Sequence, residues 1–269
     1  MNHSEDKGRK ALFQIQPMYA SRDEWEALAV REDLAYEILE LAMPPALNDP
    51  ERYRNCEEWY LKSDRVSSVH GSFIDVNPGS GDLKQQALSR ERCMESCLMA
   101  RRLGAKNVIF HSSCFPFLRG GYLDFWAGSC AEFYDKLTED VDLNLYIENS
   151  PDVDPMPIKE LMSRITDRRV RVCLDIGHVN YSLASLEQWF EELHDWIAYL
   201  HLSDNSGMYD SHLALGEGTV DWEKADRLWR DLDTPMPITI ETSSVGLAEQ
   251  SIVFLREHNY FQLYTNPAG

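Results

Sequence analysis

Val170-Arg171-Val172-Cys173-Leu174-Asp175 is a short run of strand-forming residues that ends on a carboxylate. The same arrangement recurs, because six successive strand-like runs end on, or within a few residues of, a side chain that can bind a metal ion. Three of these side chains are histidines, although the chain has only 8 histidines among 269 residues. We therefore expect the functional site at the ends of these six runs. The six runs are Ser67–His70, Asn107–His111, Leu143–Glu148, Val170–Asp175, Ile197–His201 and Ile238–Glu241.

The spacing of the runs predicts the fold. Their terminal residues lie 26 to 41 residues apart, which leaves room for a strand, a loop, a helix and a return loop in each interval. Two earlier apolar runs, Ala11–Gln16 and Tyr36–Leu41, bring the expected strands to eight. This pattern predicts a single (β/α)8 TIM barrel of the α/β class, in which the carboxyl ends of all the strands meet at one rim.

The length suits one such domain, since barrels of about 250 residues are common. We expect the barrel over residues 11–262, a polar amino-terminal tail over 1–10 and a carboxyl-terminal tail over 263–269. The first tail lacks the apolar stretch of a secretory signal, and no apolar run approaches the roughly 20 residues that span a bilayer. These features predict a cytoplasmic enzyme that does not associate with membranes.

The charge argues against nucleic acid as a partner. The chain has 26 Lys and Arg against 45 Asp and Glu, a formal net charge of -19. Proteins that bind DNA neutralise its phosphates with Lys and Arg. A basic patch on one face is compatible with this total, but the composition favours a small substrate.

Between the strands, apolar residues three and four positions apart predict helices. One covers Ser89–Leu103 and stops at Gly104, and two others cover Ser185–Trp196 and Asp221–Leu232, with Ser185 and Asp221 as amino-terminal caps. None of the six cysteines forms a C-x-x-C pair. Cys93 and Cys97 lie on one helix face, where two small buried side chains are a better interpretation than a metal or redox site.

Two loops that follow strands are distinctive. Pro44-Pro45 begins a long loop after the second strand, and the loop Ser112–Gly121 carries Phe115, Phe117 and a Gly pair. The second loop fits a mobile wall over a substrate pocket or, equally well, a packed surface loop. Its aromatic residues also suggest a homodimer. Outside the strand ends, His3, His194 and His258 are interpreted as ordinary surface or capping residues.

Carboxylates and imidazoles gather at the ends of the last strands. Such sets bind Mn²⁺, Co²⁺, Zn²⁺ or Fe²⁺. One ion would be satisfied by Glu148, Asp175, His201 and Glu241, each from a different strand. A hydrogen-bonded polar layer is the alternative, and the cost of burying carboxylates without a cation weakens it. The remaining candidates, which could instead contact substrate or form turns, are His70, His111, His178, Asp210 and His212.

The segments His201–Asn205 and Asp210–Gly218 resemble the most recognisable part of the xylose-isomerase-like barrels, and the motif order agrees over nearly the whole chain. That superfamily joins sugar and sugar-phosphate isomerases and epimerases to the type-2 apurinic/apyrimidinic (AP) endonucleases. In the isomerase branch, the resemblance implies one Mn, Mg, Co or Zn ion on the four ligands named above. Glu148 and Glu241 would then exchange a proton beside the substrate carbonyl as general base and acid, while His178 orients a substrate oxygen.

In the endonuclease branch, the resemblance implies three zinc ions on nine side chains. His70, His111 and Glu148 would hold the first, and Glu148 would bridge to a second held by Asp175, His201 and Glu241. The third would lie on His178, Asp210 and His212. Contacts with substrate are the other expectation for His70, His111 and His178, and Asn205 is a further candidate. Gly216 and Gly218 could offer backbone N–H groups to a substrate phosphate, as loops after strands seven and eight do in many barrels, although a turn explains the glycines equally well.

Two departures from the family patterns affect the choice. Related epimerases often carry an Arg where this chain has Asp210-Ser211-His212, and the endonucleases carry basic loops that this acidic chain lacks. The preferred hypothesis is a metal-dependent isomerase or epimerase of a small sugar or sugar phosphate, in carbohydrate metabolism. The alternative is an AP-endonuclease-type phosphodiester hydrolase with a trinuclear zinc site. A third hypothesis is a barrel that binds sugar without turning it over.

Overall fold

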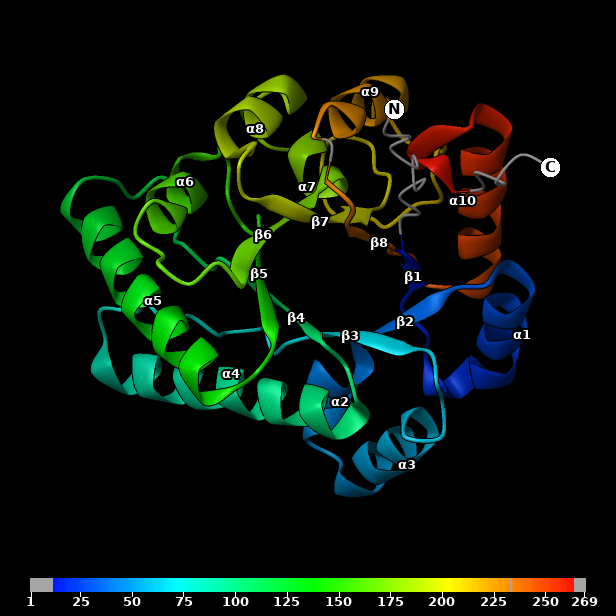
Figure 1. Ribbon diagram of the computed structural model, residues 1–269, viewed down its shortest axis with the longest axis horizontal. Coiled ribbons are helices and arrows are strands. Elements are labelled where there is room, and N and C mark those ends of the chain that lie inside the picture. Colours follow the sequence, from blue (N-terminus) through cyan, green and yellow to red (C-terminus); the bar gives the residue numbers. More distant parts are fainter. Residues whose placement is uncertain (1–11, 233, 264–269) are drawn as a thin grey trace, which may run out of the picture.

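Eight parallel strands form a closed barrel in the order of the sequence, and the last strand pairs with the first (Figure 1). The computed structural model describes residues 12–232 and 234–263. The predicted single (β/α)8 TIM barrel is therefore confirmed. The strands are β1 (Leu12–Ile15), β2 (Ala35–Ile38), β3 (Val66–His70), β4 (Asn107–His111), β5 (Asn144–Glu148), β6 (Val170–Asp175), β7 (Ile197–Leu202) and β8 (Pro237–Ile240).

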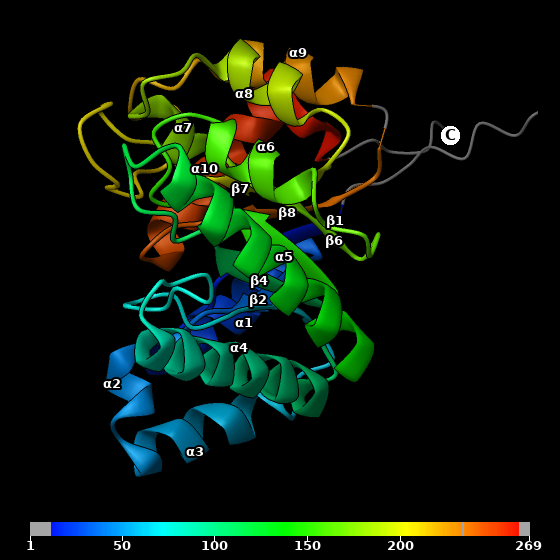
Figure 2. The ribbon, with the colours of Figure 1, turned by 90° about the vertical axis from the view of Figure 1, so that its left-hand side faces the viewer.

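Helices form an outer layer around the strands, and Figure 2 shows α5 packed beside α6. None of the helices in the described ranges is long and apolar enough to cross a membrane. The helices are α1 (Arg22–Glu32), α2 (Pro44–Leu47), α3 (Pro50–Tyr60), α4 (Leu83–Leu103), α5 (Gly121–Asp140), α6 (Met156–Met162), α7 (Ile176–Asn180), α8 (Leu186–Leu193), α9 (Trp222–Asp231) and α10 (Val245–His258). Short 3-10 turns cover Tyr19–Ser21, Glu40–Ala42 and Tyr260–Gln262.

Local signals in the sequence define several helix ends. Ser185 and Asp221 cap α8 and α9 as predicted, because their side chains accept hydrogen bonds from Gln188 N and Lys224 N. Gly104 ends α4 with a φ of 78°, a conformation that glycine adopts without strain. The helix starts earlier than predicted, at Leu83, because Asp82 caps it.

The region after β2 differs from the prediction. The expected strand Tyr36–Leu41 stops at Ile38, because the Glu40 carboxylate accepts hydrogen bonds from Tyr19 N at 2.7 Å and from Arg52 at 2.8 Å, which fixes a turn. The expected long loop at Pro44-Pro45 is also wrong. Pro44 opens α2, since the first turn of a helix needs no proline N–H, and α3 follows at once.

Two layers of core support the site. Between strands and helices lie fully buried indoles such as Trp25, Trp126 and Trp189, together with the predicted buried pair Cys93 and Cys97. Inside the barrel, the side chains two positions before His111, Glu148, Asp175 and His201 point inward as these four do, because side chains alternate along a strand. Ile109, Tyr146, Cys173 and Tyr199 form a buried cluster there, which is a packed floor beneath the strand ends.

The limits of the domain, residues 11–262, stay a prediction. Both predicted tails lie outside the described residues except for Leu263, and so does His3. The predicted homodimer and the predicted cytoplasmic location also stay predictions. His194 and His258 are exposed residues at the ends of α8 and α10, in agreement with the interpretation of them as surface residues.

Candidate metal centre and active site

Four side chains from four adjacent strand ends meet above the floor of the barrel. Glu148, Asp175 and His201 come from β5, β6 and β7, and Glu241 directly follows β8. Each offers a ligand atom, and these atoms all lie within 4.8 Å of one another. All four residues are buried. We call Glu148, Asp175, His201 and Glu241 the inner group.

Two atoms of the inner group lack a hydrogen-bond partner. Asp175 Oδ2 and His201 Nδ1 are buried and have no hydrogen-bond partner among the described residues. His201 Nδ1 faces two carboxylates, at 3.3 Å from Glu241 Oε1 and 3.5 Å from Glu148 Oε2. Buried polar atoms are rarely left without a hydrogen bond, so an oxygen and a nitrogen without one, in residues whose ligand atoms lie close together, fit a divalent cation.

The electrostatics of the inner group agree with this. Burial raises the pKa of Glu241 to about 8, and the carboxylates of Asp175 and Glu148 add to the effect although His201 opposes it. Burial also disfavours the charged form of Glu148, but the imidazoles around it outweigh burial and hold its pKa well below the ordinary value. Glu241 thus needs further positive charge nearby to stay ionised beside the other carboxylates. A divalent cation would supply it.

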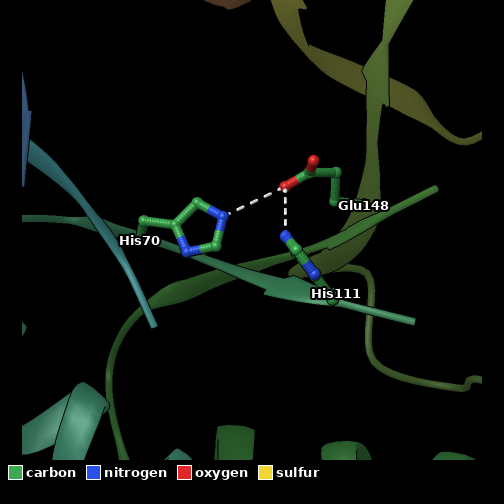
Figure 3. Close-up of side chains that lie close together, drawn as sticks. All are labelled: His70, His111 and Glu148. Atoms are coloured by element: carbon green, nitrogen blue, oxygen red, sulfur yellow. Dashed lines mark hydrogen bonds and ion pairs between the residues drawn. The ribbon is translucent and has the colours of Figure 1, made fainter. Parts of the chain in front are cut away.

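A second set of ligands shares Glu148. His70 Nε2 lies 3.2 Å and His111 Nε2 lies 3.6 Å from Glu148 Oε2, and Figure 3 shows both imidazoles directed at that oxygen. Ligand atoms of these three residues also lie within 4.8 Å of one another. We call His70 and His111 the histidine pair. The pair and Glu148 could hold another ion, with Glu148 as the bridge.

A third set lies beside the inner group and is connected to it. His178 Nδ1 lies 3.2 Å from Glu148 Oε1, and His178 Nε2 lies 3.3 Å from Asp210 Oδ2. His212 Nε2 contacts the same Asp210 oxygen at 2.8 Å. We call His178, Asp210 and His212 the outer group. All nine side chains that the sequence singled out are therefore brought together around one site.

The loop between β7 and α9 is folded around a buried carboxylate. Asp204 accepts hydrogen bonds from Gly216 N at 2.9 Å and from the Trp222 indole at 2.8 Å, and it pairs with Leu213 in a short antiparallel bridge. His212 lies immediately before this bridge, with a φ of 45°. The bridge and the hydrogen bonds therefore fix the part of the loop that carries Asp210 and His212.

The predicted substrate contacts from Asn205, Gly216 and Gly218 are not brought to the cavity. Asn205 is fully buried, and its side chain donates to Gly177 O at 2.8 Å and accepts from Gly207 N at 2.8 Å. The N–H of Gly216 is taken by Asp204. In the structure these residues hold the loop together, and their contact with substrate stays a prediction.

The inner group, the histidine pair and the outer group open into a cavity of about 890 Å³. Glu148, Glu241 and all five residues of the other two sets line it. Apolar surfaces of Phe73, Val76 and Tyr181 complete the wall, and Ser113 is the contribution of the loop after β4. The aromatic residues Phe115 and Phe117 of that loop are exposed. Among the described residues, no Lys or Arg lines the cavity.

The sequence did not point to two polar residues beneath the inner group. Glu37 in β2 is fully buried and contacts His201, and Gln16 directly after β1 is buried and contacts Glu241. The available signal was a glutamate between Tyr36 and Ile38 in an otherwise apolar run. Such a glutamate, if it points into a barrel, has to be neutralised by something near the rim.

Comparisons with known proteins agree with this fold. The chain is 26% identical to the Uncharacterized protein MJ1311 of Methanocaldococcus jannaschii over 203 residues. This alignment covers 71% of this chain and 69% of the relative. A solved D-tagatose 3-epimerase-like protein superposes with a TM-score of 0.75 at 23% identity, covering 92% of this chain and 97% of that one.

The TTHB071 protein from Thermus thermophilus, in a crystal soaked with ZnCl2, gives a TM-score of 0.72 at 20% identity and covers 93% of this chain and 97% of that one. At these identities the two structures show a shared fold. The model of the Xylose isomerase-like TIM barrel family matches residues 32–258. The resemblance seen in the sequence is thus confirmed, and the chain belongs to the xylose isomerase-like TIM barrel family.

Proposed function

We propose that the protein is a divalent-metal-dependent isomerase or epimerase of a small sugar, which acts by removing a proton beside a carbonyl. The observation that carries this proposal is the inner group, in which Asp175 Oδ2 and His201 Nδ1 have no hydrogen-bond partner among the described residues, beside Glu148 and Glu241, which line a large cavity. A structural neighbour whose name refers to a D-tagatose 3-epimerase supports the sugar class.

Each residue of the inner group has a role in this proposal. The ion would rest on Glu148, Asp175, His201 and Glu241 and, when bound, would acidify the C–H beside the sugar carbonyl. Glu148 and Glu241 come from non-adjacent strands, and both line the cavity. One would take the proton from the substrate carbon as general base, and the other would return a proton to the substrate as general acid. His178 lies 3.2 Å from Glu148 and would donate to a substrate oxygen.

The lining favours an uncharged sugar over a sugar phosphate. Four carboxylates line the cavity, from Asp75, Glu148, Asp210 and Glu241, and no described Lys or Arg does so. A phosphate dianion would meet like charges there, whereas hydroxyl groups can donate to carboxylates. The rings of Phe73 and Tyr181 offer apolar surface for the C–H faces of a sugar.

One observation favours the alternative of a phosphodiester hydrolase. The histidine pair with Glu148 forms a second possible ion site directly beside the inner group, and the outer group adds three more ligands. Several zinc ions could offset the negative lining and bind a phosphate themselves. The solved neighbour from a ZnCl2 soak is compatible with zinc in this fold.

The test measures both reactions on the same preparation. The protein is loaded with Mn²⁺, Co²⁺, Mg²⁺ or Zn²⁺ and incubated in D2O with free and phosphorylated ketoses and aldoses, and NMR follows deuterium entering the C–H beside the carbonyl. We expect exchange with a free sugar. Cleavage of a duplex with an abasic site and no exchange with any sugar would establish the alternative instead.

Substitution of the glutamates sharpens the test. Glu148→Gln and Glu241→Gln should each lower the exchange rate by about 10²–10⁴-fold, because each removes an acid–base group. Metal content is measured in parallel, to separate lost chemistry from a lost ion. Glu249→Gln, on an exposed glutamate paired with Arg31, serves as the control and should exchange at the wild-type rate. Wild-type rates in both cavity variants would contradict the proposed mechanism.

A further inference from the structure

A fully buried carboxylate lies directly beneath the inner group. Glu37 of β2 accepts hydrogen bonds at 2.9 Å from Gln16 Nε2, at 2.6 Å from the Tyr199 hydroxyl, at 2.7 Å from Thr239 Oγ1 and at 3.0 Å from His201 Nε2. None of these donors carries a fixed charge. Burial of a carboxylate is costly unless it is paired, and among these donors only His201 can take a positive charge. A role for its negative charge would explain why a glutamate occupies this position.

The contact with His201 decides which ring nitrogen faces the inner group. Because an ionised carboxylate can only accept, the bond to Glu37 Oε2 places a proton on His201 Nε2. In the neutral form of the ring, which is the form that binds a cation, the other nitrogen, Nδ1, then carries the free lone pair. This is the unpaired atom that lies between Glu148 and Glu241.

Gln16 extends the arrangement to a second residue of the inner group. Its Nε2 donates to Glu37 Oε1 at 2.9 Å and also to Glu241 Oε1 in a short hydrogen bond. An amide nitrogen has two protons and no acceptor, so it can join two carboxylates in this way. Glu37 is thereby connected to His201 directly and to Glu241 through Gln16.

We propose that Glu37 is the positioning residue of the ion site, which keeps the proton of His201 on Nε2 so that Nδ1 can bind the cation, and which orients Glu241 through Gln16. This inference rests on the proposed metal centre and adds the residue that prepares it. Carboxylates that hold a ligating imidazole in this way orient the ring and raise its basicity. Glu37 touches neither ion nor substrate and acts only through other residues.

The test compares two buried glutamates of the same segment. Glu37→Gln keeps the shape of the side chain and removes its charge. Glu40→Gln, two residues after β2, makes the same change at a buried carboxylate that accepts from Arg52 and Tyr19 N and does not contact His201. Metal-free wild type and both variants are titrated with Zn²⁺ against a chromophoric chelator, in the absence of sugar.

The ¹⁵N spectrum of labelled histidine supplies a readout that simple loosening of the fold would not change. We expect E37Q to bind Zn²⁺ about 10–100-fold more weakly, and we expect the Nε2-bound proton of His201 to lose the downfield shift of a hydrogen bond to a carboxylate. E40Q should keep wild-type affinity and the wild-type His201 signals. Wild-type affinity and an unchanged His201 spectrum in folded E37Q would overturn the proposal, as would equal losses in E37Q and E40Q.

Two further outcomes are decisive. If E37Q does not fold, the ¹⁵N spectrum of zinc-bound wild type decides. A proton on Nε2 of His201 together with a metal-shifted Nδ1 supports the proposal. A proton on Nδ1 together with a metal-shifted Nε2 overturns it. Wild type that binds no Zn²⁺ overturns both this role and the metal centre. Failure to isomerise any sugar, with zinc bound and E37Q weakened, would contradict only the proposed reaction.

Discussion

The inner and outer groups use similar side chains but differ in how their polar atoms are satisfied. In the outer group, Asp210 Oδ2 accepts from both His178 and His212, so the three side chains satisfy one another. In the inner group, Asp175 Oδ2 and His201 Nδ1 have no hydrogen-bond partner among the described residues, although carboxylates and His178 lie within ion-pair distance. The inner group is thus incomplete without a cation, whereas the outer group is already a hydrogen-bonded unit.

This difference implies an order of ion binding. A cation at the inner group gains contacts with atoms that have already lost water and have no other partner, so little has to be broken. A cation at the outer group first has to displace the imidazoles from Asp210. We expect a high-affinity ion in the inner group, and weaker ions, if any, at the histidine pair and the outer group.

The largest effect is expected from two matched Asp→Asn substitutions. Asp175→Asn removes a charged ligand of the inner group and should weaken the tightest ion by more than about 100-fold, beyond the loss typical of residues that only support a ligand. Asp210→Asn should leave that affinity close to wild type. Isothermal titration with Zn²⁺ and Mn²⁺ measures both. Equal losses would show that the two groups bind one ion set together.

A smaller effect is expected from a change in the loop between β7 and α9, which carries Asp210 and His212. At Gly218 a Cβ atom would lie 2.2 Å from Asn205 O and 2.2 Å from Asp204 Oδ1, so Gly218→Ala forces the loop to shift. We expect a loss of about 1–3 kcal/mol in the free energy of unfolding, measured with urea, and a changed His212 resonance. The affinity of the inner group should persist, and its loss would show that the two regions are not independent.

The smallest effect concerns pH. In the metal-free protein burial lowers the pKa of His212, but the hydrogen bond to Asp210 outweighs this and raises it to about 9. A raised folded-state pKa contributes stability that is complete below the unfolded value near 6.5 and is lost as pH rises through about 9. Because the ring is partly exposed, we expect a contribution of up to about 1 kcal/mol.

The measurement is the difference in unfolding free energy between wild type and Asp210→Asn, at pH 6 and at pH 10, with chelator present. The difference should shrink at the higher pH. A difference that is constant, or that grows with pH, would contradict the charged His212–Asp210 pair.

Much of the site could be predicted because the relevant signals are local. Six of the nine candidate ligands lie at or directly after the end of a strand-like run, as in Asn107–His111 and Val170–Asp175, and parallel strands in a barrel bring such ends to one rim. Glu37 and Gln16 could not be found in this way. A single polar residue within an apolar run has no distinguishing local pattern, and its partners lie in distant strands, such as Tyr199 and His201.

The sequence by itself determined the eight-fold alternation of strands and helices, the family, and the ligand types at the strand ends, because side-chain periodicity and turn residues act over short distances. Only the tertiary structure decided that Nδ1 of His201 is the unpaired nitrogen and that Asn205 and Gly216 fold a loop. Only it separated an incomplete inner group from a satisfied outer one. Burial and hydrogen bonding depend on which residues meet when the barrel closes, and those residues are far apart in the chain.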